Sequence, residues 1–583
     1  MRADPFVPGT RSMPPGRPAL LALLVAALAV PLQAQSVLGT IRGTVTDPQE
    51  GVVAAATVLI TDEATGVPRT VETDVEGRFE ASNLRPGTYR VEIVAPAFKK
   101  VERSGVVVRT GGVARVDARL DLGGVAETVS VSADALNNIV LESPAVAAGL
   151  DEQQLRDLPR NSRDMQAFLL LNPNVLGGTD DIQFLGGRTY GVSYVQDGQA
   201  STNAIFGTVG NSAPGLDAIS EVQVLSNSYS AEYGGLAGVV VTTKRGGNSY
   251  RGTSFYDFNS DALNALTYNQ KQAGTERGEP SSDTHAHRWG LSLGGPIRSN
   301  KTFFFANYEG SNQKEIWGGG RANVPTAAMR NGDFSGANFT INDPLTGRPF
   351  PGNVIPASRI DPVAQRMLDF YYPLPNRGTL SSGMGVYQQF VPETRKRQRA
   401  DLRLDHEASG SDSLFVRASY QNRDPSNIQF EAGNALTNLG IRNTRLDTAT
   451  VIGGWTKILS PTMVNEFRVG FNYDKSERQS QYRVGEVNAL LGLETAPSLR
   501  ADRPGFPSLN FAGGSSAVRP TNATDGSRNA DRTIKQNSFS LSNNVSLVRG
   551  GHSFKVGGLW TRNSAVDGFG KGVNNRGLYR FNN

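Results

Sequence analysis

The feature that most constrains the fold is a two-residue alternation that begins after residue 247. From there, apolar and aromatic residues occupy every second position of segments about ten residues long, and polar residues or glycine lie between them. Leu402 and Leu404, for example, alternate with Asp401, Arg403 and Asp405. Successive side chains of a β-strand point to opposite faces, so each segment predicts a strand with one apolar and one polar face.

The same alternation occurs in a soluble sheet with one buried face, and the connections between the strands separate the two cases. Tight turns near Ser299, Ser409 and Gly550 alternate with long connections at residues 313–396, 423–448 and 475–535. Short turns at one end and long loops at the other are typical of outer-membrane barrels, and compact soluble domains seldom contain such long connections. Residues 247–583 are therefore predicted to form antiparallel transmembrane β-barrel strands.

The N-terminal residues have the pattern of an export signal. Three arginines precede an apolar run at residues 19–30, and Pro31-Leu32-Gln33-Ala34 follows it with a small residue at the expected cleavage point. The alternative is a membrane anchor, but a helix that crosses a bilayer needs about 20 apolar residues and this run is shorter. We interpret residues 1–34 as a signal peptide.

Composition agrees with exported β structure and excludes several kinds of site. The 583 residues include 65 glycines and 31 prolines, with 38% apolar and 19% charged residues, which favours turn-rich β structure over a helical bundle or a disordered chain. The 59 basic and 54 acidic residues are dispersed and sum to a net charge of +5, so no nucleic-acid partner is expected. Cysteine is absent, which excludes thiolate metal sites, cysteine nucleophiles and disulfides.

Two smaller units precede the alternating region. Valine-rich runs separated by turn signals predict a β-sandwich at residues 37–122, and residues 123–143 read as a linker. The pattern of short helical and strand segments in residues 144–246 predicts an α+β unit. In it, Asp151 and Gln154 form a capping-box pattern for a first helix, and Ser162 is the expected cap of a second helix.

The chain resembles the TonB-dependent outer-membrane receptors, and specifically their Oar-like branch. The resemblance rests on the order of the units, on "TDVEGRFEASNLRPGTYRVEI" in the sandwich, and on "YVQDGQ", "SNSYSAEYGGLAGVVVTTKRGGNSYRGTSFYDF", "GGPIRSNKTFFFANYEG" and "YYPLPN". It implies a transthyretin-like, carboxypeptidase regulatory-like sandwich with Phe79 and Tyr89 in its core, an α+β plug domain, and an N-terminal part of a β-barrel. About ten strands are counted where the family barrel has about 22, so we expect a chain truncated before barrel closure.

The resemblance also implies a function: energised uptake of a large or scarce ligand across the outer membrane into the periplasm. The partners would be TonB of the TonB–ExbB–ExbD complex, outer-membrane lipid and an extracellular ligand. The candidate TonB box is Glu127, Thr128, Val129, Ser130, Val131, Ser132 and Ala133. An ordinary strand or linker is the alternative reading of that stretch. Arg188 in "GGR" and Glu232 in "AEYG" are candidates for contact between plug and barrel, although such charges are more often solvated or locally paired.

Other signals point to no further chemistry. His285 and His287 lie in an expected loop without a third ligand, so neither a metal site nor a cofactor is predicted. An enzyme of the carboxypeptidase type is disfavoured because its zinc ligands are missing. A non-transporting adhesion protein, in which the sandwich binds carbohydrate or peptide, is the alternative function. The sequence leaves the ligand open among siderophore, cobalamin, glycan and peptide, because the loop aromatics Trp317, Tyr371 and Tyr372 suit several of these.

Overall fold

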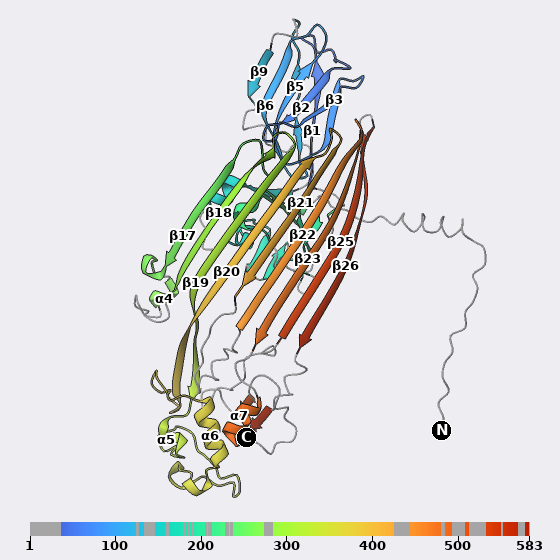
Figure 1. Ribbon diagram of the computed structural model, residues 1–583. Coiled ribbons are helices and arrows are strands. Elements are labelled where there is room, and N and C mark those ends of the chain that lie inside the picture. The colour runs from blue at the N-terminus through green and yellow to red at the C-terminus, as the bar shows by residue number, and fades with distance from the viewer. Residues whose placement is uncertain are drawn as a thin grey trace, which may run out of the picture.

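The chain is described here from a computed structural model that divides into a β-sandwich, an α+β unit and a large sheet (Figure 1). The described residues are 37–583 except 124–127, 133–145, 159–162, 179–180, 185, 189–190, 204–206, 208–212, 228–231, 234–236, 267, 273–283, 425–442, 480–483, 493–507, 512–531, 550–551, 570–577 and 582–583. The expected signal peptide lies outside them. Among the described residues, no helix is both long and apolar enough to cross a membrane.

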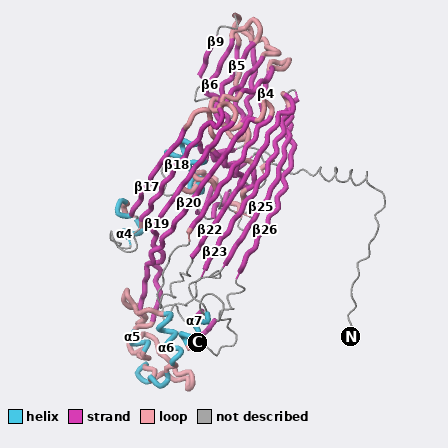
Figure 2. The backbone as a smooth tube through the Cα atoms, viewed as in Figure 1, coloured by secondary structure: helices cyan, strands magenta, loops and turns pink. Residues whose placement is uncertain are grey.

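The β-sandwich consists of two sheets. Its strands are β1 (Gly39–Thr46), β2 (Thr57–Asp62), β3 (Pro68–Glu72), β4 (Arg78–Leu84), β5 (Gly87–Val94), β6 (Lys100–Val108), β7 (Val113–Arg115), β8 (Ala118–Arg119) and β9 (Thr128–Ser132). One sheet has the order β4-β1-β7, with β8 also paired to β1, and the other has the order β3-β2-β5-β6-β9. Figure 2 shows these strands stacked at one end of the molecule.

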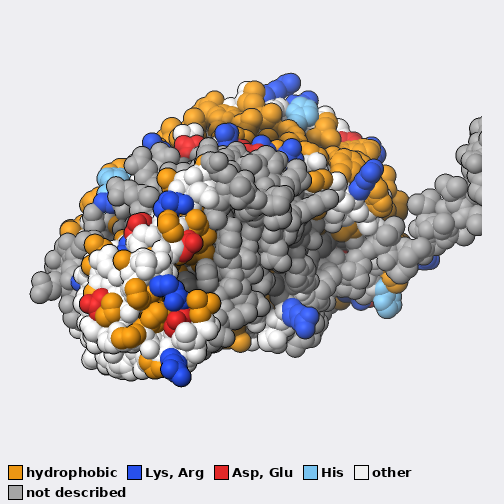
Figure 3. Space-filling model, turned by 90° about the horizontal axis from the view of Figure 1, so that it is seen from below, with side chains coloured by type: hydrophobic (Ala, Val, Ile, Leu, Met, Phe, Trp, Pro, Cys, Tyr) orange, Lys and Arg blue, Asp and Glu red, His pale blue; other side chains and the backbone are white. Residues whose placement is uncertain are grey.

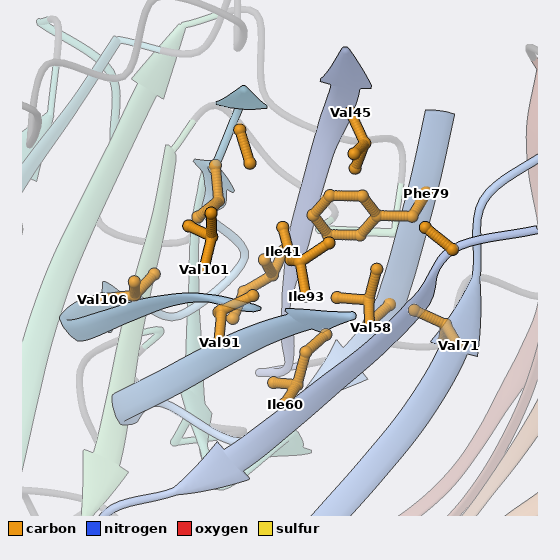
Figure 4. Close-up of a cluster of buried hydrophobic side chains, with 14 of the residues drawn as sticks. Ile41, Val45, Val58, Ile60, Val71, Phe79, Val91, Ile93, Val101 and Val106 are labelled. Carbon is orange, nitrogen blue, oxygen red and sulfur yellow. The ribbon is translucent and has the colours of Figure 1, made fainter. Parts of the chain in front are cut away.

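The sandwich core comes directly from the strand alternation. In β1, "GTIRGTVT", every second residue is buried, which places Ile41 and Val45 between the sheets. They meet Phe79, Val58 and Ile93 from neighbouring strands (Figure 4). Phe79 is 3% exposed and Tyr89 is 4% exposed, which confirms both as core residues.

The α+β unit is built around a five-stranded sheet of order β10-β15-β16-β13-β14. Its elements are β10 (Val146–Asp151), α2 (Glu152–Asp157), α3 (Met165–Leu169), β11 (Val175–Gly178), β12 (Asp181–Phe184), β13 (Val192–Gln196), β14 (Gln199–Ala200), η3 (Leu216–Ala218), β15 (Ile219–Asn227) and β16 (Ala237–Thr243). All seven residues of β16 are buried, as expected of a strand covered on both faces.

The sequence predicted the N-terminal cap of α2 correctly and that of α3 incorrectly. The Asp151 side chain accepts from the Gln154 amide, and the Gln154 side chain accepts from the Asp151 amide, which confirms the capping box of α2. The cap expected at Ser162 is wrong, because α3 starts at Met165 and its N-cap is Asp164. The carboxylate of Asp164 makes no capping hydrogen bond and instead pairs with Arg397 of the large sheet at 2.7 Å.

The large sheet contains nine described antiparallel strands in chain order. They are β17 (Arg251–Ser260), β18 (His285–Arg298), β19 (Thr302–Val324), β20 (Gly385–Glu407), β21 (Asp412–Arg423), β22 (Asn443–Ser460), β23 (Met463–Gln479), β25 (Arg532–Arg549) and β26 (His552–Phe569). η4 (Asp261–Leu263) and α4 (Tyr268–Gln272) follow β17. The sheet is open, since the described strands β17 and β26 each pair on one side alone.

The two faces of this sheet differ as the alternation predicts. Large apolar side chains on the outward face are strongly exposed, among them Leu291 (62%), Leu402 (48%), Val451 (45%), Phe471 (41%) and Trp560 (49%). Inward-facing neighbours are polar and buried, among them Ser292 (4%), Asp401 (5%), Thr450 (1%), Arg468 (3%) and Ser540 (0%). Figure 3, which looks from the α5 and α6 end, shows hydrophobic side chains gathered along the outer surface.

A loop cap lies at the end of the sheet opposite the sandwich (Figure 1). It contains α5 (Ala327–Arg330), η6 (Pro351–Asn353), η7 (Ala357–Arg359), α6 (Pro362–Tyr371), α7 (Val484–Leu491), β24 (Ser508–Phe511) and β27 (Leu578–Phe581). The connections are shorter than predicted, because β19 and β20 continue as a paired hairpin out to Val324 and Gly385. Tyr371 and Tyr372 are 0% exposed in the cap core, so these two aromatics pack and do not face a ligand.

Removing the Phe79 ring should destabilise the sandwich. Phe79→Ala is expected to lower the free energy of local opening of β1 and β4 by about 3–5 kcal/mol, because it leaves a cavity in a packed core. Hydrogen exchange on the full chain measures this quantity. Val75→Ala is the control, since Val75 is 79% exposed and its loss should change stability by less than about 0.5 kcal/mol. Equal exchange in both variants would contradict the core assignment.

Candidate functional site

The α+β unit presents one hairpin tip to the inner face of the large sheet. β13 and β14 pair with Val195 opposite Ala200 and Gln196 opposite Gln199, which leaves Asp197-Gly198 as a two-residue turn. Both turn residues have positive φ, +45° at Asp197 and +81° at Gly198. An Asp-Gly pair suits such a turn, because Asp tolerates the left-handed region and Gly has no Cβ to strain it.

The Asp197 carboxylate is the centre of a buried charge cluster. Arg403 Nη1 of β20 donates to its Oδ1 at 3.2 Å, and Arg417 Nη1 of β21 donates to its Oδ2 at 2.9 Å. Within the unit, the Thr243 amide donates to Oδ1 at 3.0 Å. Arg417 also donates to Gln196 Oε1 at 2.9 Å. Asp197 is 2% exposed and the Arg417 side chain 1%, so one carboxylate joins two wall strands in a site closed to solvent.

Electrostatics keep this carboxylate charged. Burial acts to raise the pKa of Asp197, but the guanidinium groups of Arg417 and Arg403 and the hydrogen bonds from Thr243 outweigh it, and the pKa lies below its usual range. At neutral pH the Asp197 anion therefore lies between two cations. Asp405, 2.9 Å from Arg403, supplies a second anion.

The rest of the same tip contacts two more wall strands. A Cβ at Gly198 would collide with the Arg468 guanidinium of β23, so a larger residue there would displace that side chain. Gln199 Nε2 donates to Ser542 Oγ at 3.2 Å, and Ser540 Oγ donates to Gln199 Oε1 at 2.8 Å, both on β25. We call Gln196–Gln199 with its wall partners the tip contact.

A second group of contacts joins the unit to β19 and β20. Arg163 Nη2 lies 2.6 Å from Asp217 Oδ2 inside the unit and 3.9 Å from Glu309 of β19. The Gly215 amide donates to Asp401 Oδ2 of β20 at 3.0 Å. These contacts are ionic or hydrogen-bonded, like those of the tip contact.

The sandwich is joined to both other parts near the short turns of the large sheet. Arg245, at the end of the α+β unit, forms an ion pair with Asp62 of β2. Arg85 Nη1 donates to Glu407 Oε1 of β20 at 2.9 Å and lies 3.6 Å from Asp405 Oδ1. A cavity of 110 Å³ lies at this junction, bordered by Asp62 and Arg85 on one side and the turn residues 409–413 on the other.

The two predicted contact charges lie in different surroundings. Glu232 Oε2 is 2.7 Å from Lys555 Nζ of β26, so this carboxylate does meet a wall strand. Arg188 is exposed, and within the described ranges no ion pair of its side chain is found. Its pairing with the wall stays a prediction.

Five residues of the candidate TonB box, Thr128–Ser132, form β9, which pairs in parallel with β6 of the sandwich. Glu127 and Ala133 lie outside the described residues. The described part of the box therefore has strand conformation, as its alternating valines indicate. Its binding to TonB stays a prediction.

The histidines lie in a strand rather than in the expected loop. His285 and His287 begin β18, with ring centroids 5.7 Å apart, and Tyr256 Oη lies 2.7 Å from His287 Nδ1. No group of three or more potential metal-ligating side chains occurs in the part of the chain that the structure describes.

Sequence reasoning did not identify Asp197, Arg403 or Arg417 as a site. The "YVQDGQ" stretch was used only for the family resemblance, and the alternation marked the polar face of β20, but nothing local linked the two. The Asp-Gly pair is a signal for a hairpin turn, but it does not show which groups the aspartate will contact. Its partners lie 206 and 220 residues further along the chain.

Neutralising Asp197 should weaken the tip contact. Asp197→Asn leaves the buried guanidinium of Arg417 without its anion and that of Arg403 with Asp405 alone, and we expect the α+β unit to lose about 3–5 kcal/mol of stability. Because the folded pKa of Asp197 is lowered, its contribution is full above the unfolded pKa of about 3.9 and disappears as pH falls through the folded value. The difference between wild type and Asp197→Asn should therefore vanish in acid.

The measurement is maleimide labelling of a cysteine placed at buried Val239 during urea unfolding, which is clean because the chain has no native cysteine. Asp157→Asn is the matched surface control, since the Asp157 side chain is 55% exposed, and it should shift the free energy by less than about 0.5 kcal/mol. An unchanged urea midpoint for Asp197→Asn at neutral pH would show that the cluster does not hold the unit.

Two family models match the sequence. An outer membrane beta barrel domain matches residues 242–583, and a carboxypeptidase regulatory-like domain matches residues 40–121. The TonB-dependent transporter Oar of Myxococcus xanthus is 25% identical over 282 residues, which cover 46% of this chain and 26% of that protein. The chain thus spans about a quarter of the length of this curated relative.

Two solved structures are similar to part of this chain. The transporter YddB from Escherichia coli has a TM-score of 0.45 at 11% identity and covers 75% of this chain and 50% of its own. The ferric enterobactin receptor PfeA from Pseudomonas aeruginosa has a TM-score of 0.41 at 12% identity, covering 73% and 50%. The barrel model covers more than half of the chain, and the chain therefore belongs to the outer-membrane β-barrel domain family, as an Oar homologue with an N-terminal carboxypeptidase regulatory-like domain.

Proposed function

We propose that this protein is a TonB-dependent receptor that takes up a large or scarce ligand into the periplasm, with the α+β unit as its plug. The observation that carries the proposal is the tip contact. A small folded unit lies on the polar face of the large sheet and is attached there through buried charges centred on Asp197. Such a unit would block the lumen of a barrel until it moves.

The chemistry of the contact supports a plug that can be moved. The unit meets the wall through ion pairs and hydrogen bonds, at Asp197, Gly215 and Glu232 among others. Polar groups of this kind can exchange their partners for water when the surfaces separate, whereas a large apolar interface would leave exposed hydrophobic area on both sides.

The proposed energy-coupling partner is TonB, and the proposed handle is Glu127–Ala133. A strand binds a partner sheet through main-chain hydrogen bonds, which require extended backbone and little side-chain specificity. Thr128–Ser132 has this conformation and lies between the sandwich and β10, the first strand of the α+β unit. A force applied to it would reach the α+β unit through residues 133–145.

The position of the sandwich favours uptake over adhesion. It lies at the short-turn end of the large sheet, where Arg85 pairs with Glu407, while the loop cap lies at the opposite end (Figure 1). Short turns face the periplasm in outer-membrane barrels. A sandwich that recognised extracellular carbohydrate or peptide would belong at the loop end.

Deleting residues 127–133 should abolish uptake and leave surface binding intact, because the deletion removes the handle and none of the loops. Labelled ferric siderophore, cobalamin and oligosaccharide are offered separately to cells, and bound and periplasmic label are measured. A probe that binds should remain bound to the deletion variant while its periplasmic accumulation is lost.

The second measurement is co-purification of TonB with the full chain, which should be lost in the same variant whichever probe binds. A seven-residue deletion of residues 134–140 is the control for chain shortening, because it leaves both the handle and the loops in place. Normal accumulation and normal TonB co-purification after deletion of 127–133 would refute the handle assignment.

A further inference from the structure

The candidate TonB box is already used as a strand within the protein. β9 pairs with β6 in parallel over five residues, from Thr128 opposite Lys100 to Ser132 opposite Ser104. The sheet order β3-β2-β5-β6-β9 places β9 at the edge. The main-chain groups through which a strand joins a partner sheet are therefore partly occupied by the sandwich.

β9 is a short and separable member of that sheet. It has five residues where β6 has nine, and it pairs on one side alone among the described strands. Parallel pairing is slightly less stable per residue than antiparallel pairing, and edge strands are the first to separate from a sheet. Removing β9 would leave the antiparallel pairing of β5 with β6 intact.

The sandwich is also held in place, which limits where the box can go. Asp62 pairs with Arg245, and Asn248 Nδ2 donates to Thr65 O at 2.7 Å, so β2 and its following turn are attached where the large sheet begins. Leu122 is bridged to Phe98 of the sandwich. Thr128 follows Leu122 by six residues, which span about 20 Å at full extension. A released box would thus remain close to the edge of β6.

We propose that the edge of β6 competes with TonB for the box, so that TonB binds only after β9 has separated from the sandwich. The proposal rests on the proposed function, since it takes Glu127–Ala133 as the handle. The sandwich then acts as an intramolecular latch. Pairing with β6 keeps the handle folded, and TonB engages in proportion to the fraction of molecules in which β9 is free.

A disulfide between the two strands tests the latch. Glu102 lies opposite Ser130 in the β6–β9 register and opposite Glu92 in the β5–β6 register. Glu102→Cys with Ser130→Cys should lock the box to the sandwich. Glu92→Cys with Glu102→Cys should lock the sandwich and leave the box free. The two variants share one substitution, and no native cysteine competes with either pair.

The probe is the purified periplasmic domain of TonB, and binding to the purified full chain is measured with each pair oxidised and reduced. We expect the oxidised Glu102–Ser130 pair to weaken binding by at least about tenfold and reduction to restore it. The Glu92–Glu102 pair should bind TonB equally in both redox states.

Three results would overturn the latch. In the first, the Glu102–Ser130 cysteines fail to cross-link while the control pair forms its disulfide. In the second, TonB binds the cross-linked chain as tightly as the reduced chain, by adding to the outer edge of β9. In the third, both disulfides weaken TonB binding equally. Measuring TonB binding to a free peptide of residues 124–135 distinguishes failure of the latch from failure of the proposed function. If TonB binds neither the peptide nor the reduced chain, the handle assignment itself is wrong.

Discussion

The structure depends on the separation of two environments by a single sheet. Each inner strand of the large sheet is hydrogen-bonded to a neighbour on both sides, and such pairing is the condition for a β-structure to lie in a membrane. What distinguishes the faces is the side chains: Leu402 is 48% exposed on one face, while its neighbour Arg403 is 7% exposed on the other. An inner face of this kind needs water or polar partners, because unpaired buried charges are costly.

The α+β unit supplies those polar partners through its Asp-Gly turn, which also closes the β13–β14 hairpin. The Asp-Gly turn between β13 and β14 needs residues that tolerate positive φ. The same aspartate carries a charge to Arg403 and Arg417, and the same glycine leaves room for Arg468. Local backbone requirements and wall contact thus select the same two residues. Asp197→Asn and a change at Gly198 would therefore act through different mechanisms, one electrostatic and one steric.

The three parts of the chain meet around a short series of opposite charges. Arg85 of the sandwich lies beside Asp405, Asp405 pairs with Arg403, and Arg403 pairs with Asp197 of the α+β unit. Arg245 and Asp62 join the same two units a second time. The proposed TonB-binding segment lies in sequence between the sandwich and the α+β unit, which are both attached to the wall.

Local rules predicted a large part of the fold. The two-residue alternation identified the two faces of β20, the valine-rich runs identified the sandwich, and Asp151 with Gln154 identified the start of α2, because each signal is contained within a few neighbouring residues. The ends of β19 and β20 were not predicted. Their outer pairs, up to Val324 with Gly385, extend past the apolar band, and backbone pairing without alternation leaves little trace in a sequence.

The sequence by itself determined that alternating strands follow residue 247, which of their faces is apolar, and that tight turns lie near Ser299 and Ser409. Only the tertiary structure decided that Asp197 meets Arg403 and Arg417, that Asp164 pairs with Arg397 instead of capping its helix, and that β9 joins β6. The physical reason is the distance along the chain over which each kind of interaction acts. Strand alternation, turn conformation and helix capping act between near neighbours in the chain, whereas a charge selects its partner by distance in space after the chain has folded.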